Sequence, residues 1–149
     1  MYETILVPLD GSTRAEAILP HVERMTRLCG AEVILLQVVD PPPRIEVPEE
    51  FNIVLHQQQL ERLAQRAQEY LGGLADELHE KGIKARKRVV HGPVVEAILT
   101  TANREKADLI AIASHGRTGL TQVFYGSVAA GVLHRIDRPL LLIRSQGGG

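Results

Sequence analysis

The stretch Ile5-Leu6-Val7-Pro8-Leu9 runs directly into Asp10-Gly11-Ser12-Thr13. The apolar run is too short for a helix, and the residues that follow it are typical of a tight turn. After the turn the apolar residues fall on one helical face that Gly30 ends, with Ser12 or Thr13 placed to cap its start: Ala15, Ile18, Val22, Met25 and Cys29. The chain is therefore predicted to open with a buried strand, a turn and an amphipathic helix.

The same alternation continues along the chain. Apolar runs indicate buried strands at 33–39, 109–113 and 140–143, and the mostly polar run 84–90 indicates a strand at a sheet edge. Helical spacing predicts three further helices, over Leu60–Leu78 with an end near Gly82, over Val95–Ala102, and over Ser127–Arg135. Strands alternating with helices in this way favour a parallel sheet with right-handed crossovers, so the predicted fold is a doubly wound α/β sandwich.

Length and composition predict a single domain. A chain of 149 residues is long enough to bury one core, and its 3% aromatic content requires that core to be aliphatic, as in buried parallel strands. We expect the domain to span residues 1–146, followed by a disordered glycine tail at 147–149. One long irregular segment is predicted at 41–50, where three prolines open the run. It is either a lid or partner surface, or a plain connector.

Charge and cysteine content exclude several classes of protein. A net charge of -1 gives no basic field for nucleic acid. Cys29 is the only cysteine, so an internal disulfide or a multi-cysteine metal site is excluded. No apolar run approaches the roughly 18 residues of a membrane span, and the N-terminus lacks the apolar run of a signal peptide. We therefore expect a cytoplasmic protein that binds neither membrane nor nucleic acid.

The ligand crevice of an open α/β sheet lies at the carboxyl ends of its strands, where the winding direction reverses. The loops to consider are therefore Pro8–Thr13 after the first strand and Ser114–Gly119 after the strand at 109–113. Glycine lets backbone amides approach a ligand, and a helix N-terminus attracts an anion. Gly126, Ser127 and Val128 are thus a candidate phosphate site to which Arg117 would add charge, although Gly-Ser is also an ordinary helix cap.

Two segments together resemble the universal stress protein family over essentially the whole chain. They are Val7–Ser12 and Ala113-Ser114-His115-Gly116, the latter followed after nine residues by Gly126-Ser127. Nucleotide-binding members carry Gly, two residues, Gly, nine residues, Gly, then Ser or Thr. This chain matches at Gly116, Gly126 and Ser127, and has Ala113 at the first glycine. The resemblance implies a Rossmann-like sheet of the adenine nucleotide alpha hydrolase type with strand order 3-2-1-4-5.

The resemblance also implies a set of ATP-binding residues. Asp10 would face the ribose and adenosine, Pro8 and the backbone of Val38 would border the adenine, and Gly116, Gly126, Ser127 and Val128 would hold the phosphates. Leu9, Ala113, His115 and Arg117 complete the expected set. A divalent metal, Mg²⁺ or Mn²⁺, would arrive with the phosphates rather than at a site of its own, because the scattered histidines lack metal-ligand spacing.

Enzyme motifs are absent from the sequence. It contains neither a P-loop, nor a Gly-x-Gly-x-x-Gly fingerprint, nor the Ser-Gly-Gly-x-Asp-Ser and His-x-Gly-His motifs of enzymes that share this general fold. His115 has no evident orienting carboxylate, so we assign it no catalytic role. The expected function is ATP-dependent regulation or stress response with at most very slow hydrolysis. The alternatives are a member that binds no ATP, or binds cyclic AMP, and acts through protein partners, and a slow ATP hydrolase.

Two further surfaces are singled out by charge. The run Leu140–Ile143 carries none of the charges that protect a sheet edge, so we expect a homodimer paired through this strand. The basic residues of 81–88 either protect the opposite edge or contact a phosphate backbone, and edge protection is the preferred interpretation.

Overall fold

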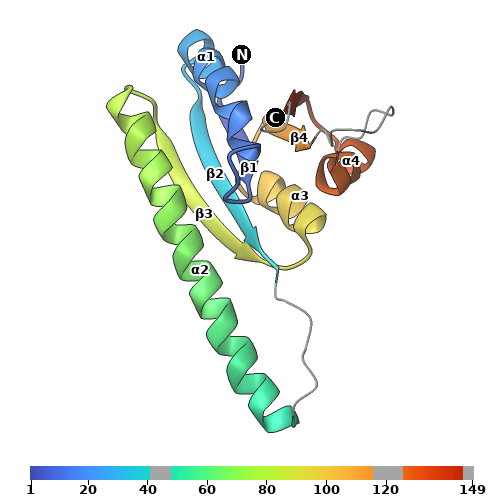
Figure 1. Ribbon diagram of the computed structural model, residues 1–149. Coiled ribbons are helices and arrows are strands. Elements are labelled where there is room, and N and C mark those ends of the chain that lie inside the picture. Colours follow the sequence, from blue (N-terminus) through green and yellow to red (C-terminus); the bar gives the residue numbers. More distant parts are fainter. Residues whose placement is uncertain (41–47, 116–125, 146–149) are drawn as a thin grey trace.

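The computed structural model describes residues 1–40, 48–115 and 126–145, which form a five-stranded parallel sheet between two layers of helices (Figure 1). The sheet order β3-β2-β1-β4-β5 confirms the predicted fold and strand order. The elements, in chain order, are β1 (Thr4–Leu9), η1 (Ala15–Ile18), α1 (Leu19–Cys29), β2 (Glu32–Val39), α2 (Glu49–Glu80), β3 (Ala85–His91), α3 (Val94–Arg104), β4 (Leu109–His115), α4 (Gly126–Arg135) and β5 (Leu140–Ser145).

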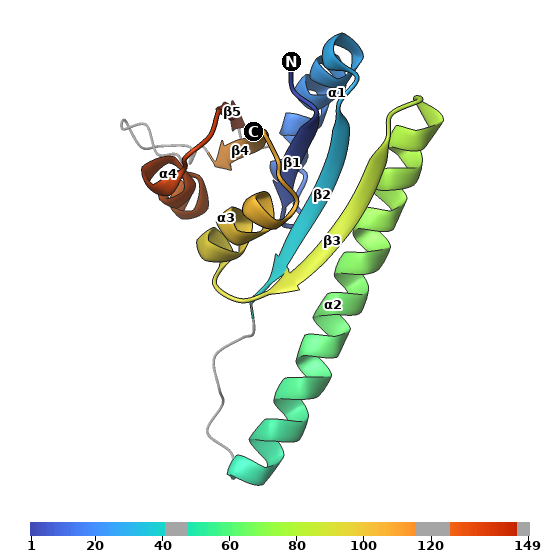
Figure 2. The same ribbon diagram turned by 180° about the vertical axis from the view of Figure 1, so that it is seen from behind.

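The sheet is buried on both faces. Seen from behind, α2 lies on one side of the strands and α3 and α4 lie on the other (Figure 2). Along β2, Val33 and Leu35 join the core under α1 and α2, whereas Ile34 and Leu36 join the core under α3 and α4. All four side chains have no exposed area. A continuous aliphatic run therefore suits this strand, because successive side chains point to opposite faces and both faces are covered.

The first helix differs from its prediction at the start. A single helix was expected from Ala15, but the chain makes the 3-10 turn η1 before α1 begins at Leu19. Pro20 lies in the first turn of α1, where its missing amide hydrogen is tolerated, and it ends the run of helical hydrogen bonds further upstream. The Ser12 hydroxyl accepts a 3.2 Å hydrogen bond from the Ala15 amide, and Gly30 ends α1 at φ 69°. The predicted end signal at Gly30 is confirmed. The predicted cap is wrong, because Arg14 and Ile18 stand at the N-cap positions of η1 and α1 without a side-chain cap bond.

The second helix begins much earlier than predicted. It starts at Glu49, so residues 49 and 50 of the expected irregular segment are helical, and it ends before Gly82 as expected. The extra turns carry apolar side chains on several sides, which hides a helical period, but their Glu, Gln and Leu residues favour a helix. Pro48 lies just before the first turn. The rest of that segment, 41–47, and the tail at 147–149 lie outside the described residues.

Ion pairs stabilise the polar edge of the sheet. β3 pairs only with β2 in the sheet, as predicted for its charged sequence. Arg86 contacts Glu32 at 2.7 Å and Glu105 at 2.9 Å, and Arg88 contacts Glu105 at 2.7 Å. Burial of Glu105 opposes its ionisation, but the hydrogen bonds and charges of the two arginines outweigh burial and keep its pKa below the ordinary value. The basic run thus protects a solvated edge.

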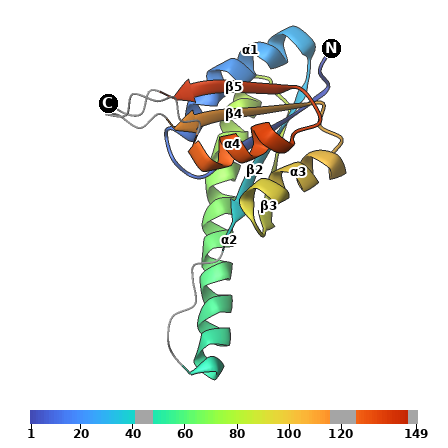
Figure 3. The same ribbon diagram turned by 90° about the vertical axis from the view of Figure 1, so that its right-hand side faces the viewer.

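β5 forms the other edge and pairs with β4 from Leu140 to Ser145 (Figure 3). The turn before it is held by Arg138, whose guanidinium donates to the Ala102 and Ala107 carbonyls at 3.0 and 2.7 Å and also bonds the Asn103 side chain. A cation at the C-terminus of α3 satisfies carbonyls that the helix leaves unpaired. This link fixes α3 to the edge that carries β5.

Candidate functional site

A cleft of about 220 Å³ opens at the carboxyl ends of the strands, where the winding of the sheet reverses. β1 and β2 stay paired along the whole of β1, from Thr4–Glu32 to Leu9–Gln37. β1 and β4 are paired only at Ile5–Leu109 and Leu6–Ile110. The separation of the two strands beyond those pairs leaves the space that the cleft occupies, which is the position predicted for a ligand crevice.

The cleft brings together every predicted site residue that the structure describes in full. These residues are Pro8, Leu9, Asp10, Val38, Ala113, Gly126, Ser127 and Val128. They come from four elements that are far apart in the sequence and meet only in the folded chain. His115 ends β4 but its side chain lies outside the described parts of the structure, as do Gly116 and Arg117 entirely.

Apolar residues that were not predicted make up the rest of the lining. They are Ala15, Leu36, Val94, Ile98, Ile112 and Ala129. Leu36 shares a strand face with Val38, and Ile98 belongs to the apolar stripe that predicted the third helix. The periodicity of the strand and of the helix therefore contained both residues, but no motif assigned them to the crevice.

Asp10 provides a carboxylate at the end of β1. Its Oδ1 atom accepts hydrogen bonds from the Ser12 amide at 2.9 Å and the Ser12 hydroxyl at 2.6 Å. Gly11 makes the turn possible at φ 87°, a conformation that other residues rarely adopt. Asp10 therefore closes the turn ahead of the first helix while its exposed side chain lines the cleft.

The N-terminus of α4 also lines the cleft. Gly126 begins this ten-residue helix at φ 72°, and the exposed Ser127 follows it. The first amides of a helix have no partner within it, and the helix dipole adds partial positive charge there. This part of the cleft is suited to a negatively charged group.

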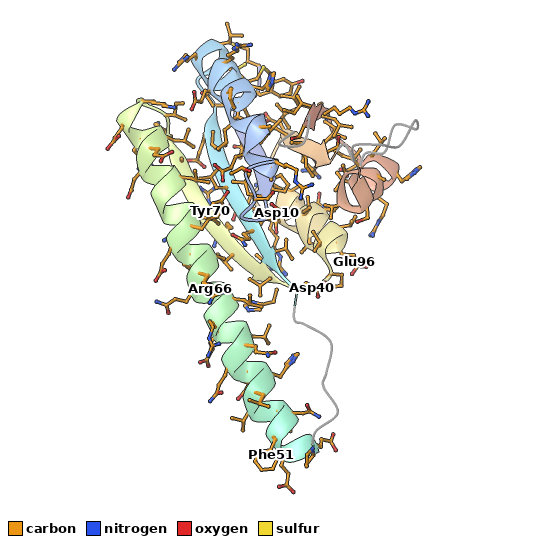
Figure 4. The ribbon with its side chains drawn as sticks, in the orientation of Figure 1. Asp10, Asp40, Phe51, Arg66, Tyr70 and Glu96 are labelled. Atoms are coloured by element: carbon orange, nitrogen blue, oxygen red, sulfur yellow. The ribbon has the colours of Figure 1, made fainter. Side chains whose placement is uncertain are left out.

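Tyr70 supports the loop of Asp10 from α2. Its hydroxyl donates a 2.7 Å hydrogen bond to the Glu16 carboxylate in η1. Burial, reinforced by that bond, raises the pKa of the Tyr70 hydroxyl well above its ordinary value, so the hydroxyl remains a donor at neutral pH. Tyr70 and Asp10 lie at the same level of the molecule (Figure 4). The contact joins the longest helix to the turn beside the cleft.

The cleft combines apolar walls with a few polar groups. Most of its lining is apolar, and a carboxylate and a helix N-terminus are also part of it. Such a site suits a ligand with an apolar part, hydroxyl donors and a negative group. Within the described ranges, no three His, Cys, Asp or Glu side chains are grouped to hold a metal ion, and no helix is long and apolar enough to cross a bilayer.

Comparisons with known proteins relate the whole chain to one family. The model of the universal stress protein family matches residues 1–144. Universal stress protein MJ0577 of Methanocaldococcus jannaschii is 31% identical over 97% of this chain and 96% of the relative. A solved structure of MJ0577 superposes with a TM-score of 0.81 and covers 99% of both chains.

Two more distant structures share the fold. One is a universal stress protein in complex with cAMP, 20% identical, with a TM-score of 0.60 over 97% of this chain and 98% of the other. The second is the universal stress protein from Archaeoglobus fulgidus in complex with dAMP, 19% identical, with a TM-score of 0.59 over 95% and 98%. At these identities the likeness establishes the fold only.

The close approach of α3 and α4 behind the cleft yields a prediction about Gly131. A Cβ atom added at Gly131 would lie 2.7 Å from Cγ2 of Val95. Ala stabilises a helix by about 1 kcal/mol relative to Gly. Overpacking of the kind that this Cβ would cause destabilises a protein by about 1–3 kcal/mol. We therefore expect Gly131→Ala to lower the free energy of unfolding, measured by urea denaturation.

Gly73→Ala is the matched control, because Gly73 lies in the exposed interior of α2 and an added Cβ meets nothing within 4 Å. It should raise the free energy of unfolding by about 0.5–1 kcal/mol. Val95→Ala should relieve the clash, so the double variant Gly131→Ala/Val95→Ala should be more stable than the sum of the single effects. Equal stabilisation by both glycine substitutions would show that α3 and α4 are not packed this closely.

Proposed function

The chain belongs to the universal stress protein family, and we propose that it binds ATP in the cleft between β1 and β4 as a regulatory ligand. The observation that carries the proposal is that Asp10 and the α4 N-terminus line one apolar cleft. These two features are the ones that a nucleotide requires, a hydrogen-bond acceptor for the ribose and unpaired amides for phosphate. The lone Cys29, which leaves no internal disulfide, agrees with action in the cytoplasm.

We infer one orientation of ATP from the residues that line the cleft. Pro8, Val38 and the apolar wall around them border the adenine. Asp10 accepts hydrogen bonds from the ribose hydroxyls. Gly126 to Val128, at the start of α4, bind the phosphates. The positive φ of Gly126 supports this assignment, because a side chain there would be strained and would crowd the amides. We expect Mg²⁺ or Mn²⁺ to be bound with the phosphates.

A smaller adenine nucleotide is the main alternative. Ala113 replaces the first glycine of the family motif and lines the cleft at the end of β4, where its methyl group narrows the space near the phosphates. The cAMP and dAMP complexes of two relatives support adenine as the shared ligand part without favouring a triphosphate. A member without bound ATP would instead act through a protein partner. Mass spectrometry of ligand released from the purified, denatured protein distinguishes these cases.

We also propose a homodimer formed through β5. This edge strand presents Leu140, Leu141, Leu142 and Ile143, all half-buried and uncharged. Pairing with a second β5 across a two-fold axis would satisfy the backbone groups of both edges. The opposite edge at β3 carries the ion-paired arginines and is unsuited to such pairing.

The ATP proposal predicts a specific effect of Gly126→Val. ATP at about 100 times its dissociation constant stabilises the folded protein by about 2.7 kcal/mol, which raises the melting temperature of a domain of this size by about 5–10 °C. The variant should fold but lose this ATP-dependent shift, because the Val side chain blocks the amides at the start of α4.

Gly30→Val is the matched control, since Gly30 also lies at a helix end at φ 69°, and an added Cβ there meets nothing within 4 Å. It imposes similar backbone strain away from the cleft and should retain the full shift. Ser127→Ala should weaken binding by about 1–2 kcal/mol, and Ala113→Gly should preserve or improve it. A full shift in folded Gly126→Val would place the phosphates elsewhere.

Turnover should be slow or absent. In the described part of the cleft, Asp10 is engaged by Ser12 and no histidine lines the wall, so the residues at hand hold a nucleotide rather than activate water. Bound ATP should persist for many minutes in an assay of released phosphate. Hydrolysis near the roughly 10 s⁻¹ typical of enzymes would favour the hydrolase alternative.

The proposed dimer predicts that Leu142→Lys lowers the molecular mass measured by light scattering. A lysine on each of two paired edges opposes their association. The mass should fall by half at micromolar concentration, while Lys87→Ala on the β3 edge leaves it unchanged. A wild-type protein that is already monomeric would exclude the dimer.

A further inference from the structure

The N-terminal half of α2 projects beyond the rest of the described fold. Figures 1, 2 and 3 agree that it continues past the carboxyl ends of β2 and β3. Figure 4 labels Arg66 at about the level of Asp40, which follows β2. At 1.5 Å per residue, residues 49–66 extend for about 26 Å. The first buried residue of α2 is Ala67, so this projecting half, residues 49–66, lacks the packing that holds the remainder of the helix.

The projecting half nevertheless carries apolar surface. In the described residues, four of the seven large apolar side chains that are exposed fall within five positions of this helix. They are Phe51, Ile53, Val54 and Leu55, with exposed fractions of 61%, 57%, 52% and 39%. Surface of this kind, gathered in one place, is typical of an interaction site.

One stripe along the projecting half continues the face that packs on the sheet. Ala67, Leu71, Leu74 and Leu78 are buried against the sheet at spacings of three and four residues. The same spacing, followed toward the N-terminus, reaches Leu63, Leu60, His56 and Ile53. Side chains at these intervals share one face of a helix and form the seam of a helix pair. The stripe therefore continues beyond the half of α2 that is buried against the sheet, with Ile53 exposed and His56, Leu60 and Leu63 half-buried.

The charges of the projecting half select the partner and its direction. Glu49 and Glu50 lie at one end, and Arg62 and Arg66 lie toward the other. Two copies arranged antiparallel bring opposite charges to the same level, whereas a parallel pair would bring like charges together. Antiparallel pairing around a two-fold axis level with Gln58 also places Ile53 opposite the partner's Leu63, and Leu60 opposite the partner's His56.

A lipid surface fits the same residues less well. Residues 49–66 carry three carboxylates and two guanidinium groups, whereas helices that lie on membranes are rich in Lys and Arg on their polar face. The apolar side chains outside the stripe, Phe51, Val54 and Leu55, lie in the first two turns. In the antiparallel pair these turns lie level with the start of the partner's sheet. We expect these three side chains to be partly buried against the partner there.

We propose that the projecting half of α2 binds the same segment of a second copy of this chain as an antiparallel helix pair. This contact is separate from the nucleotide cleft and from β5. A chain with two self-complementary surfaces forms either a closed tetramer or an open row of copies.

Disulfide formation tests the arrangement residue by residue. In a Cys29→Ser background, His56→Cys/Leu60→Cys places thiols opposite each other across the seam, and only a bond between two copies gives a covalent dimer. Oxidation should give a covalent dimer at least tenfold faster than either single variant. In the single variants, identical positions are offset by about 6 Å along the axis. Added to the lateral distance between two helices whose axes lie about 8–10 Å apart, this offset puts a disulfide out of reach.

Gln58→Cys/Gln65→Cys is the matched control, because both positions are exposed and lie on the helix face opposite the stripe. Equal rates for the seam pair and this control would overturn the proposal. Light scattering gives an independent measurement: Leu60→Glu should lower the mass to that of the dimer paired through β5, and Gln65→Glu should leave the mass unchanged. A wild-type mass retained by Leu60→Glu would also overturn the proposal, as would binding to phosphatidylglycerol vesicles that Ile53→Glu abolishes.

Failure of the helix pair can be distinguished from failure of the proposed ATP binding. Leu60 lies outside the cleft, so Leu60→Glu should keep the ATP-dependent rise in melting temperature. Leu142→Lys should still form the disulfide-linked dimer through His56→Cys/Leu60→Cys. Only the combination Leu60→Glu/Leu142→Lys should be monomeric, and a dimeric combination would contradict the assignment of both surfaces.

Discussion

The short pairing between β1 and β4 is the constraint on which the site depends. Two central strands of one sheet are paired at Ile5–Leu109 and Leu6–Ile110 and then separate, while each keeps its other neighbour. The chain leaves β1 toward the α1 face of the sheet and leaves β4 toward the α4 face, so the two connections diverge at the carboxyl ends of the strands. Pro8 lies in the separated part of β1 and has no amide hydrogen to donate. The position of the cleft is thus a consequence of the sheet topology, and the loops contribute polar groups to it.

The elements around that gap are held by contacts between distant parts of the chain. Gly131 lets α4 approach Val95 on α3, and Arg138 joins the turn before β5 to the C-terminus of α3. Tyr70 on α2 reaches Glu16 beside the Asp10 turn. Each contact fixes one wall or one end of the cleft relative to the sheet. The site is therefore preorganised by packing and hydrogen bonds outside it, which limits the entropy that a ligand must lose on binding.

The sequence predicted the fold well where a local signal was strong. The aliphatic runs of β1, β2 and β4, the glycines at 30 and 82, and the charged β3 edge each produce one recognisable pattern, and all are confirmed. Prediction failed where tertiary context decided the outcome. Residues 49–59 show no clean helical period, and the wall residues of the cleft have no motif. Pairs such as Arg138 with Ala107 and Tyr70 with Glu16 are separated by 31 and 54 positions and leave no pattern in a single sequence.

The length of α2 shows how a helix persists where its own packing ends. A segment of about 18 residues is marginal as an isolated helix in water, because nucleation is unfavourable. Here the packed turns from Ala67 onward supply the nucleus, and each residue toward Glu49 adds one hydrogen bond to an existing helix. Propagation explains the helix, but it does not explain its side chains, since Gln or Glu would serve as well as Ile53 and Phe51. Apolar residues that contribute nothing to the isolated fold are the part of the sequence that a single copy leaves unexplained.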